Sequence, residues 1–218
     1  MKLWDADSRA AQVDAVLSRA PVLPVLSVTR LDDAVPLARA LVDAGLQVLE
    51  LTLRTDAALD AIHAIRNQVP EALIGAGTVL DANGLAAAAE AGAQFAISPG
   101  ATEALYAAAE HTRLPWIPAV ASASEVMRGL EHGHRRFKFF PAEAAGGVAA
   151  LRSLAGPFAA VRFCPTGGID AQNAPRYLAL PNVVTVGGSW MVPGPALAAR
   201  DWAQVGALAR ACVGLRGR

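Results

Sequence analysis

The chain has 218 residues, of which 54% are hydrophobic and 17% are charged. This composition excludes a disordered segment and suits one densely packed domain, predicted to span residues 1–218. Because 19 basic residues balance 19 acidic ones, neither nucleic acid nor an anionic membrane is an expected partner.

The N-terminal segment predicts a helix over 6–19 rather than a targeting signal, because it has helical spacing and acidic residues but no apolar core. No apolar run reaches the roughly 18 residues of a membrane span, since Pro, Gly or charge interrupts each one. Both cysteines, Cys164 and Cys212, are predicted to be buried thiols in a reducing compartment. We therefore expect a cytoplasmic protein.

Apolar, β-branched runs alternate with Ala-rich helical stretches along the rest of the chain. Strands are predicted at 22–28, 48–54, 73–79, 95–100, 116–121, 136–141, 161–167 and 183–190. Helices are predicted at 32–44, 56–68, 81–91, 102–111, 123–132, 147–155, 170–179 and 199–214. Eight such alternations favour parallel strands in a (β/α)8 TIM barrel with an additional N-terminal helix. A doubly wound open sheet is the alternative, but the first strand lacks a Gly-rich fingerprint after it.

The second predicted strand carries an acid and a cation. Side chains alternate between the faces of a strand, so Glu50, Thr52 and Arg54 share one face while leucines occupy the other. In a barrel, the leucines would pack on the helices and the polar trio would point inward. An internal Glu50–Arg54 ion pair is one interpretation. A catalytic role is the other, because barrel active sites lie at the C-terminal ends of the strands.

The sixth predicted strand places Lys138 among phenylalanines, on the same face as Phe140. A free lysine has a pKa of about 10.4 and is almost wholly protonated at neutral pH. Desolvation or a nearby cation, for which Arg54 is a candidate, would lower that pKa and free the amine to attack a carbonyl. The structural alternatives are a lysine at the barrel rim or one paired with Glu50.

Two Gly-Gly pairs, Gly167-Gly168 and Gly187-Gly188, end the seventh and eighth strands. Barrels frequently bind phosphate with these two loops, because glycine lets backbone N–H groups approach the anion. At the ends of the third and fourth strands, Thr78 can donate a hydrogen bond to a carboxylate, and Pro99 can shape the wall of a pocket.

The histidines do not predict a metal site. His132 and His134 are two residues apart and have no third plausible ligand nearby. His63 and His111 have the spacing of helix-surface residues, and Trp116 is expected in the core.

These motifs together resemble the 2-keto-3-deoxy-6-phosphogluconate aldolase family, whose members often also cleave 4-hydroxy-2-oxoglutarate. The similarity runs from about residue 21 to residue 190. It rests on six segments, ELTLRT at 50–55, GAGTVL at 75–80, FAISPG at 95–100, FKFFPAE at 137–143, RFCPTGGI at 162–169 and GGSW at 187–190. The segments around Lys138 and at the end of the seventh strand are the most specific.

The resemblance implies a class I aldolase that is homotrimeric and uses neither a metal nor another cofactor. Lys138 would form a Schiff base with the C2 ketone of a phosphorylated keto acid, and Glu50 would be the general acid and base, working through a water molecule. The remaining implied contacts are Arg54 and Thr78 to the carboxylate, Phe140 and Pro99 along the pocket, Thr166 to the substrate, and Gly167, Gly168, Gly188 and Ser189 to the phosphate. Arg30 receives no role.

Three alternatives remain open from the sequence. A related aldolase could act on the galactonate analogue or on unphosphorylated hydroxyoxoglutarate. A metal-dependent class II aldolase would need clustered carboxylate or His ligands. A non-catalytic phospho-metabolite sensor would keep the Gly-rich loops but would not need both Lys138 and Glu50.

Overall fold

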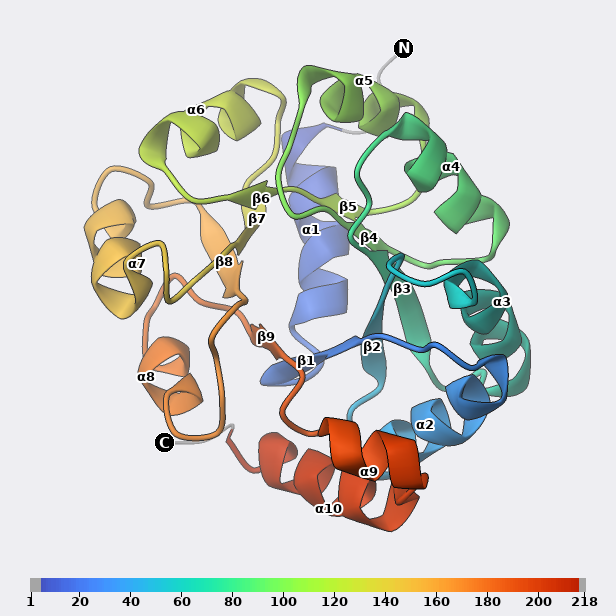
Figure 1. The fold of residues 1–218 in the computed structure, drawn as a ribbon. Helices are drawn as coiled ribbons and strands as arrows, with labels where there is room; N and C mark the ends of the chain where they lie inside the picture. The colour runs from blue at the N-terminus through green and yellow to red at the C-terminus, as the bar shows by residue number, and fades with distance from the viewer. Residues whose placement is uncertain (1–4, 216–218) are drawn as a thin grey trace.

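The computed structural model describes residues 5–215, which form a ring of parallel strands surrounded by helices (Figure 1). The strands are β1 Val22–Leu26, β2 Val48–Thr52, β3 Leu73–Gly77, β4 Ala96–Ile97, β5 Trp116–Ile117, β6 Ala119–Val120, β7 Arg136–Phe139, β8 Arg162–Pro165 and β9 Val186–Gly188. One sheet has the order β5-β4-β3-β2-β1-β9, and a second has the order β6-β7-β8.

The two sheets form one barrel. β5 and β6 are two halves of the predicted fifth strand, and Pro118, which has no N–H to donate, lies between them. Its carbonyl still accepts a hydrogen bond from the Lys138 N–H at 3.0 Å. On the other side, parallel bridges from Phe163 to Val183 and from Thr166 to Gly187 join β8 to the β9 segment. The predicted (β/α)8 barrel is therefore confirmed.

The helices lie on the outside of the barrel, except α1. They are α1 Ala6–Leu17, α2 Leu31–Asp43, α3 Ala58–Gln68, α4 Ala82–Glu90, α5 Glu103–His111, α6 Ala123–Glu131, α7 Gly147–Ala155, α8 Ala174–Leu178, α9 Gly194–Ala199 and α10 Trp202–Val213. No helix among the described residues is both long enough and apolar enough to cross a membrane.

Two helix predictions were wrong in extent. The helix predicted at 170–179 is only α8, because the Asp170 carboxylate accepts the N–H groups of Gln172 and Asn173 in a turn before it. The helix predicted at 199–214 is α10 alone, and α9 was missed. Arg200 separates the two in a left-handed conformation, with φ of 54°.

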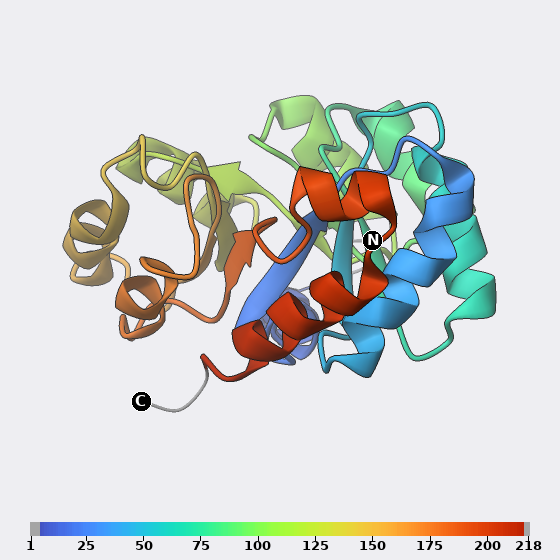
Figure 2. The ribbon, with the colours of Figure 1, turned by 60° about the horizontal axis from the view of Figure 1, so that its bottom comes forward.

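α1 closes the N-terminal end of the barrel. Val13, Val16 and Leu17 pack with Leu23 and Val48 in an inner apolar cluster, and Figure 1 shows the helix behind the strands. Because α1 covers this end, a ligand is expected at the opposite mouth, where the strands end. Figure 2 shows α9 at that mouth and α10 along the outside of the barrel.

Both cysteines are free and buried, as predicted. Burial raises the pKa of Cys164 to about 12 and that of Cys212 to about 11. Neither thiol therefore ionises near neutral pH, which suits a packing role.

Candidate active site

Lys138 and Glu50 meet inside the barrel although 88 residues separate them. The Lys138 amine donates a hydrogen bond to Glu50 Oε1 at 3.0 Å, and the two side chains are only 7% and 1% exposed. The second carboxylate oxygen, Oε2, is buried and has no hydrogen-bond partner among residues 5–215. A buried pair with one acceptor still unused is a costly arrangement unless a ligand or water completes it.

The Glu50 side chain packs directly against Gly77, in the space that a larger side chain would occupy. A Cβ atom added to Gly77 would lie 2.3 Å from Glu50 Oε1 and 2.6 Å from its Cγ, so no larger residue fits there without displacing the carboxylate. Sequence reasoning did not assign Gly77 a role. A glycine inside a strand is the signal that could have found it, because such a glycine often marks a close approach.

Arg54 lies beyond the end of β2 and is exposed. The alternation of side chains along the predicted strand had placed it inside the barrel with Glu50, and this prediction was wrong. Its Nε donates to Thr78 Oγ1 at 3.1 Å. Thr78 has φ of 58°, a left-handed conformation that is unusual for threonine. The internal Glu50–Arg54 ion pair is not formed, since Glu50 binds Lys138 instead. Arg54 and Thr78 thus form a separate polar pair that can receive a carboxylate.

Glycines shape the ends of β8 and β9. Gly167 and Gly168 have φ of 104° and 75°, which L side chains rarely adopt. A Cβ on Gly187 would lie 2.2 Å from the Thr166 hydroxyl oxygen, which is buried. Gly188 lies against the Trp190 ring in the same way. The glycines therefore permit close approaches in these two loops that a larger residue would block.

A hollow of about 240 Å³ lies at the mouth beside these loops. Its lining comes from the ends of β1 and β2, the residues just after them, the segment between β9 and α9, and α9 itself. It comprises Val25, Leu26, Ser27, Thr52, Arg54, Ser189, Val192 and Leu197. It joins Arg54 to Ser189, which are two of the residues predicted to bind anionic ends of a substrate.

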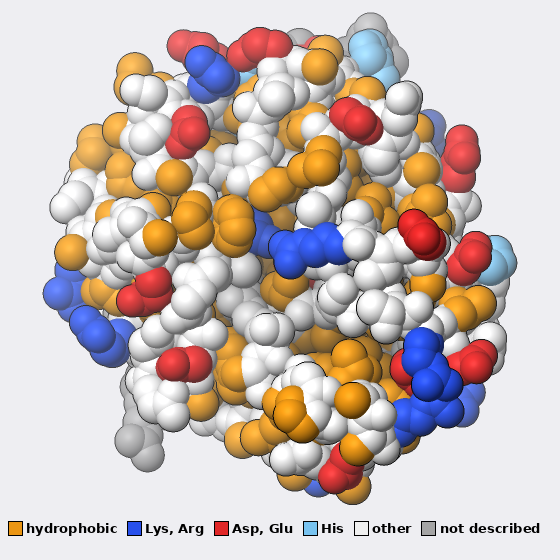
Figure 3. Space-filling model, in the orientation of Figure 1, with side chains coloured by type: hydrophobic (Ala, Val, Ile, Leu, Met, Phe, Trp, Pro, Cys, Tyr) orange, Lys and Arg blue, Asp and Glu red, His pale blue; other side chains and the backbone are white. Residues whose placement is uncertain are grey.

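Half-buried apolar residues complete the mouth. The Phe140 ring centroid lies 5.5 Å from the Lys138 nitrogen, and Pro99 follows β4 at the same end of the barrel. Figure 3 shows Lys and Arg side chains at the centre of this face, among hydrophobic and uncharged groups. An anionic substrate therefore meets local positive charge on a molecule with no net charge.

The histidines have structural partners. His132 Nε2 lies 3.0 Å from Glu103 Oε2, and buried His134 lies 3.0 Å from Arg9 Nη1 on α1. Burial, followed by the nearby Arg9 charge, lowers the pKa of His134 to about 3. His63 and His111 are exposed, as predicted, and Trp116 is buried in the core. Between residues 5 and 215 there is no group of three or more His, Cys, Asp or Glu side chains placed to hold a metal ion.

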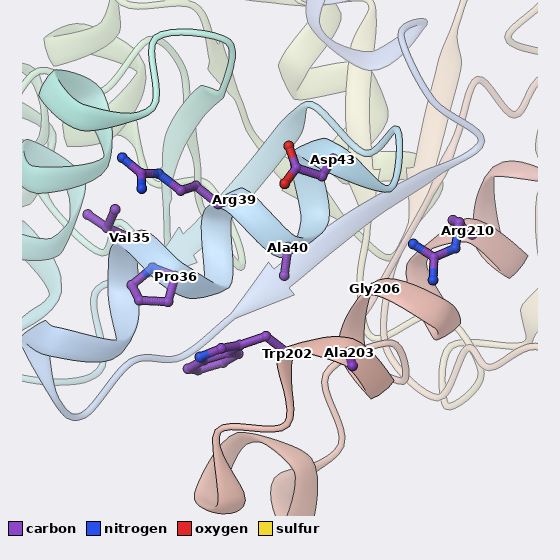
Figure 4. A pocket seen from close by; sticks show the side chains of 9 residues that line it. All are labelled: Val35, Pro36, Arg39, Ala40, Asp43, Trp202, Ala203, Gly206 and Arg210. Atoms are coloured by element: carbon purple, nitrogen blue, oxygen red, sulfur yellow. The ribbon is translucent and has the colours of Figure 1, made fainter.

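A second hollow, of about 490 Å³, lies outside the barrel between α2 and α10 (Figure 4). Val35, Pro36 and Trp202 line it together with two arginines, Arg39 and Arg210. None of the residues predicted for catalysis or binding belongs to it. This hollow is therefore separate from the predicted site residues.

A barrel with a buried amine–carboxylate pair in its interior has the architecture of a Schiff-base aldolase, and solved structures support this class. The *Legionella pneumophila* KDPG aldolase, with pyruvate captured as a covalent carbinolamine, superposes with a TM-score of 0.90 at 48% identity, covering 92% of this chain and 97% of that one. The *Zymomonas mobilis* 2-keto-3-deoxy-6-phosphogluconate aldolase with 3-phosphoglycerate gives 0.89 at 50% identity, covering 94% and 96%.

The sequence comparison narrows the class to a family. Residues 13–208 match the family described as KDPG and KHG aldolase. The KHG/KDPG aldolase of *Escherichia coli* K12 is 53% identical over 213 residues, which is 98% of each chain. The chain therefore belongs to the KDPG and KHG aldolase family, as its motifs predicted.

Proposed function

We propose that this chain is a class I aldolase that cleaves 2-dehydro-3-deoxy-6-phosphogluconate into pyruvate and glyceraldehyde 3-phosphate. The observation that carries the proposal is the buried Lys138–Glu50 pair inside the barrel, with a 3.0 Å hydrogen bond between amine and carboxylate. Membership of an aldolase family and the covalent pyruvate adduct in the *Legionella* relative support the same chemistry.

The reaction begins when the Lys138 amine adds to the C2 ketone. The ketone oxygen then takes up a proton from solvent and leaves as water, which gives an iminium ion. Glu50, directly or through a water molecule, takes the proton of the C4 hydroxyl. The C3–C4 bond then breaks, the aldehyde leaves, and the bonding electrons form an enamine with the iminium carbon. Glu50 returns a proton to C3, and hydrolysis of the new iminium releases pyruvate and restores Lys138. Positioned proton transfer of this kind contributes about 10²- to 10⁴-fold to the rate.

The two ends of the substrate would bind different groups. Arg54 and Thr78, already hydrogen-bonded at 3.1 Å, would hold the C1 carboxylate. Gly167, Gly168, Gly188 and Ser189 would receive the 6-phosphate through backbone N–H groups and a hydroxyl. Thr166, Phe140 and Pro99 would contact the carbon chain between them. The 3-phosphoglycerate in the *Zymomonas* relative, which carries a carboxylate and a phosphate, is consistent with this division.

A second substrate is favoured by the *Escherichia coli* relative, whose name includes both activities. We propose that 4-hydroxy-2-oxoglutarate is cleaved by the same residues into pyruvate and glyoxylate, since only the phosphate contacts would be unused. The galactonate analogue, which differs at C4, remains an alternative substrate of the same chemistry.

Borohydride trapping tests the mechanism. With pyruvate and borohydride, the protein should gain one reduced pyruvyl group on Lys138, and Lys138→Met should gain none and lose turnover. An active protein that stays unmodified would refute the Schiff base. Loss of activity in EDTA would instead favour a metal-dependent aldolase, and phosphosugar binding with no turnover would favour a sensor. Steady-state rates on the phosphogluconate, galactonate and hydroxyoxoglutarate substrates would rank the specificities.

The resemblance also supports a homotrimer in the cytoplasm, with a small phosphorylated keto acid as its ligand and with neither nucleic acid nor a membrane as a partner. Light scattering tests the assembly. The expected mass is about three times the 22.5 kDa of one chain, and a monomeric mass would refute the trimer.

A further inference from the structure

Glu143 is an acidic residue next to a loop that is proposed to bind phosphate. It lies in the turn between β7 and α7, and its N–H donates to the Gly167 carbonyl at 3.1 Å. A Cβ on Gly168 would lie 2.8 Å from both Cβ and Cγ of Glu143, so the glycine packs directly on this side chain. A carboxylate free to swing toward this loop would repel an anion bound there.

Tyr177 holds that carboxylate. Its hydroxyl donates a short hydrogen bond to Glu143 Oε1 from α8, and its side chain is fully buried. Burial, and then the bond to Glu143, raises the pKa of Tyr177, so the hydroxyl keeps its proton and remains a donor. Gly147, where a Cβ would lie 3.0 Å from the Tyr177 oxygen, leaves space for this contact.

The contacts form a closed ring around the Gly167-Gly168 loop. Backbone bonds tie the loop to the turn before α7, and the Glu143–Tyr177 bond ties that turn to α8. Asn173, just before α8, donates its side-chain amide to the Gly168 carbonyl at 2.9 Å. Figure 1 shows α7 and α8 side by side next to β8. Both loop glycines have positive φ and lie outside regular β-sheet hydrogen bonding. The directions of their N–H groups therefore depend on the contacts that the loop makes with the turn before α7 and with Asn173.

We propose that Glu143 and Tyr177 are positioning residues that hold the Gly167-Gly168 loop in its phosphate-binding shape, and that they thereby set the preference for phosphorylated over unphosphorylated keto acids. In this proposal Glu143 and Tyr177 act through the loop and do not touch the reacting atoms. The inference rests on the proposed function for its substrates, but its effect on phosphate binding can be measured without turnover.

Tyr177→Phe is the sharpest variant, because it removes one hydroxyl and leaves Glu143, which is exposed, able to turn to water. We expect the KM for the phosphorylated substrate to rise about tenfold, the scale of one hydrogen bond to a charged group. The kcat should stay within about twofold, and kcat/KM for 4-hydroxy-2-oxoglutarate should not change. Tyr106→Phe is the matched control, since Tyr106 is buried on α5 and contacts His132 and Trp116 instead.

Variants at Glu143 test the same ring from the other side. Glu143→Ala should reproduce the effect of Tyr177→Phe, and combining the two should add nothing further. Glu143→Gln keeps an acceptor oxygen for Tyr177 and should restore a near-normal KM. Equal losses on both substrates, or no change on either, would overturn the proposal.

The Kd of inorganic phosphate, followed by ³¹P NMR on each protein, separates this inference from the proposed function. The inference expects about a tenfold weaker Kd in Tyr177→Phe than in Tyr106→Phe. If the wild type cleaves neither keto acid, the proposed function fails, and the phosphate Kd alone tests the positioning role. An equal Kd in Tyr177→Phe and Tyr106→Phe would then refute that role.

Discussion

The amine of Lys138 lies 3.0 Å from Glu50 Oε1, while the other oxygen of the same carboxylate, also buried, has no hydrogen-bond partner in the described part of the chain. One carboxylate can therefore contact the nucleophile and still accept a proton from a water or a substrate hydroxyl on its second oxygen. An aldolase needs a nucleophile and a proton carrier. Here Lys138 and Glu50 supply these two roles, and one hydrogen bond joins them.

Replacing Glu50 with Gln should remove the proton carrier and keep the nucleophile. We expect kcat to fall by about 10²- to 10⁴-fold, while pyruvate and borohydride still modify Lys138. Exchange of the pyruvate methyl protons with D₂O, followed by NMR, should slow by a similar factor because it requires protonation of the enamine. Exchange at the wild-type rate would show that another group carries the proton.

Gly77→Ala should displace Glu50. The new Cβ would lie 2.3 Å from its Oε1, so the carboxylate must move away from Lys138, and we expect kcat to fall by about 10²-fold or more. Gly156→Ala is the matched control, because no atom lies within 4 Å of its added Cβ and φ is −63°. Equal activity of the two variants would contradict the assigned role of Gly77.

Arg54→Ala should weaken the binding of every substrate that carries a 2-keto carboxylate. Loss of one hydrogen bond to a charged group is worth about 1.5–3 kcal/mol, so we expect KM to rise about 10- to 100-fold for both keto acids. The pyruvate concentration needed for trapping should rise by the same factor. A KM that rises only for the phosphorylated substrate would place Arg54 at the phosphate instead.

Stability should depend on pH through His134. Its pKa is lowered from 6.5 to about 3 in the folded protein, so below pH 6.5 the unfolded chain binds a proton that the folded one does not. The stabilisation is complete above pH 6.5 and is lost as pH falls toward 3, at a cost of about 3 kcal/mol by pH 4. Buried His134 faces Arg9, His132, Tyr106 and Trp116.

The His134→Gln variant isolates this effect, because its amide oxygen can still accept from Arg9 but does not titrate. Urea unfolding at pH 7 and pH 4 should show a smaller loss of unfolding free energy in the variant, by about 3 kcal/mol. Identical losses in the two proteins would mean that other groups control the acid sensitivity.

Local pattern predicted much of this protein. Strand periodicity and helix spacing identified the barrel. The alternation of side chains between the two faces of a strand predicted that Glu50 and Lys138 point inward, because this alternation does not depend on the partner strand. Motif resemblance then indicated the family. Parity failed for Arg54, because β2 ends at Thr52 and the alternation ends with it.

Only the tertiary structure decided which inward groups touch. Glu50 could have paired with Arg54 four residues away, yet it binds Lys138 from a strand 88 residues later. The buried Arg9–His134 contact joins residues 125 positions apart, and the Glu143–Tyr177 contact joins residues 34 positions apart. No local sequence pattern predicted either contact. The physical reason is that barrel closure, not sequence spacing, sets the distance between side chains on different strands. The amino-acid sequence by itself determined which residues could do the chemistry, and the closed barrel determined which pairs can do it together.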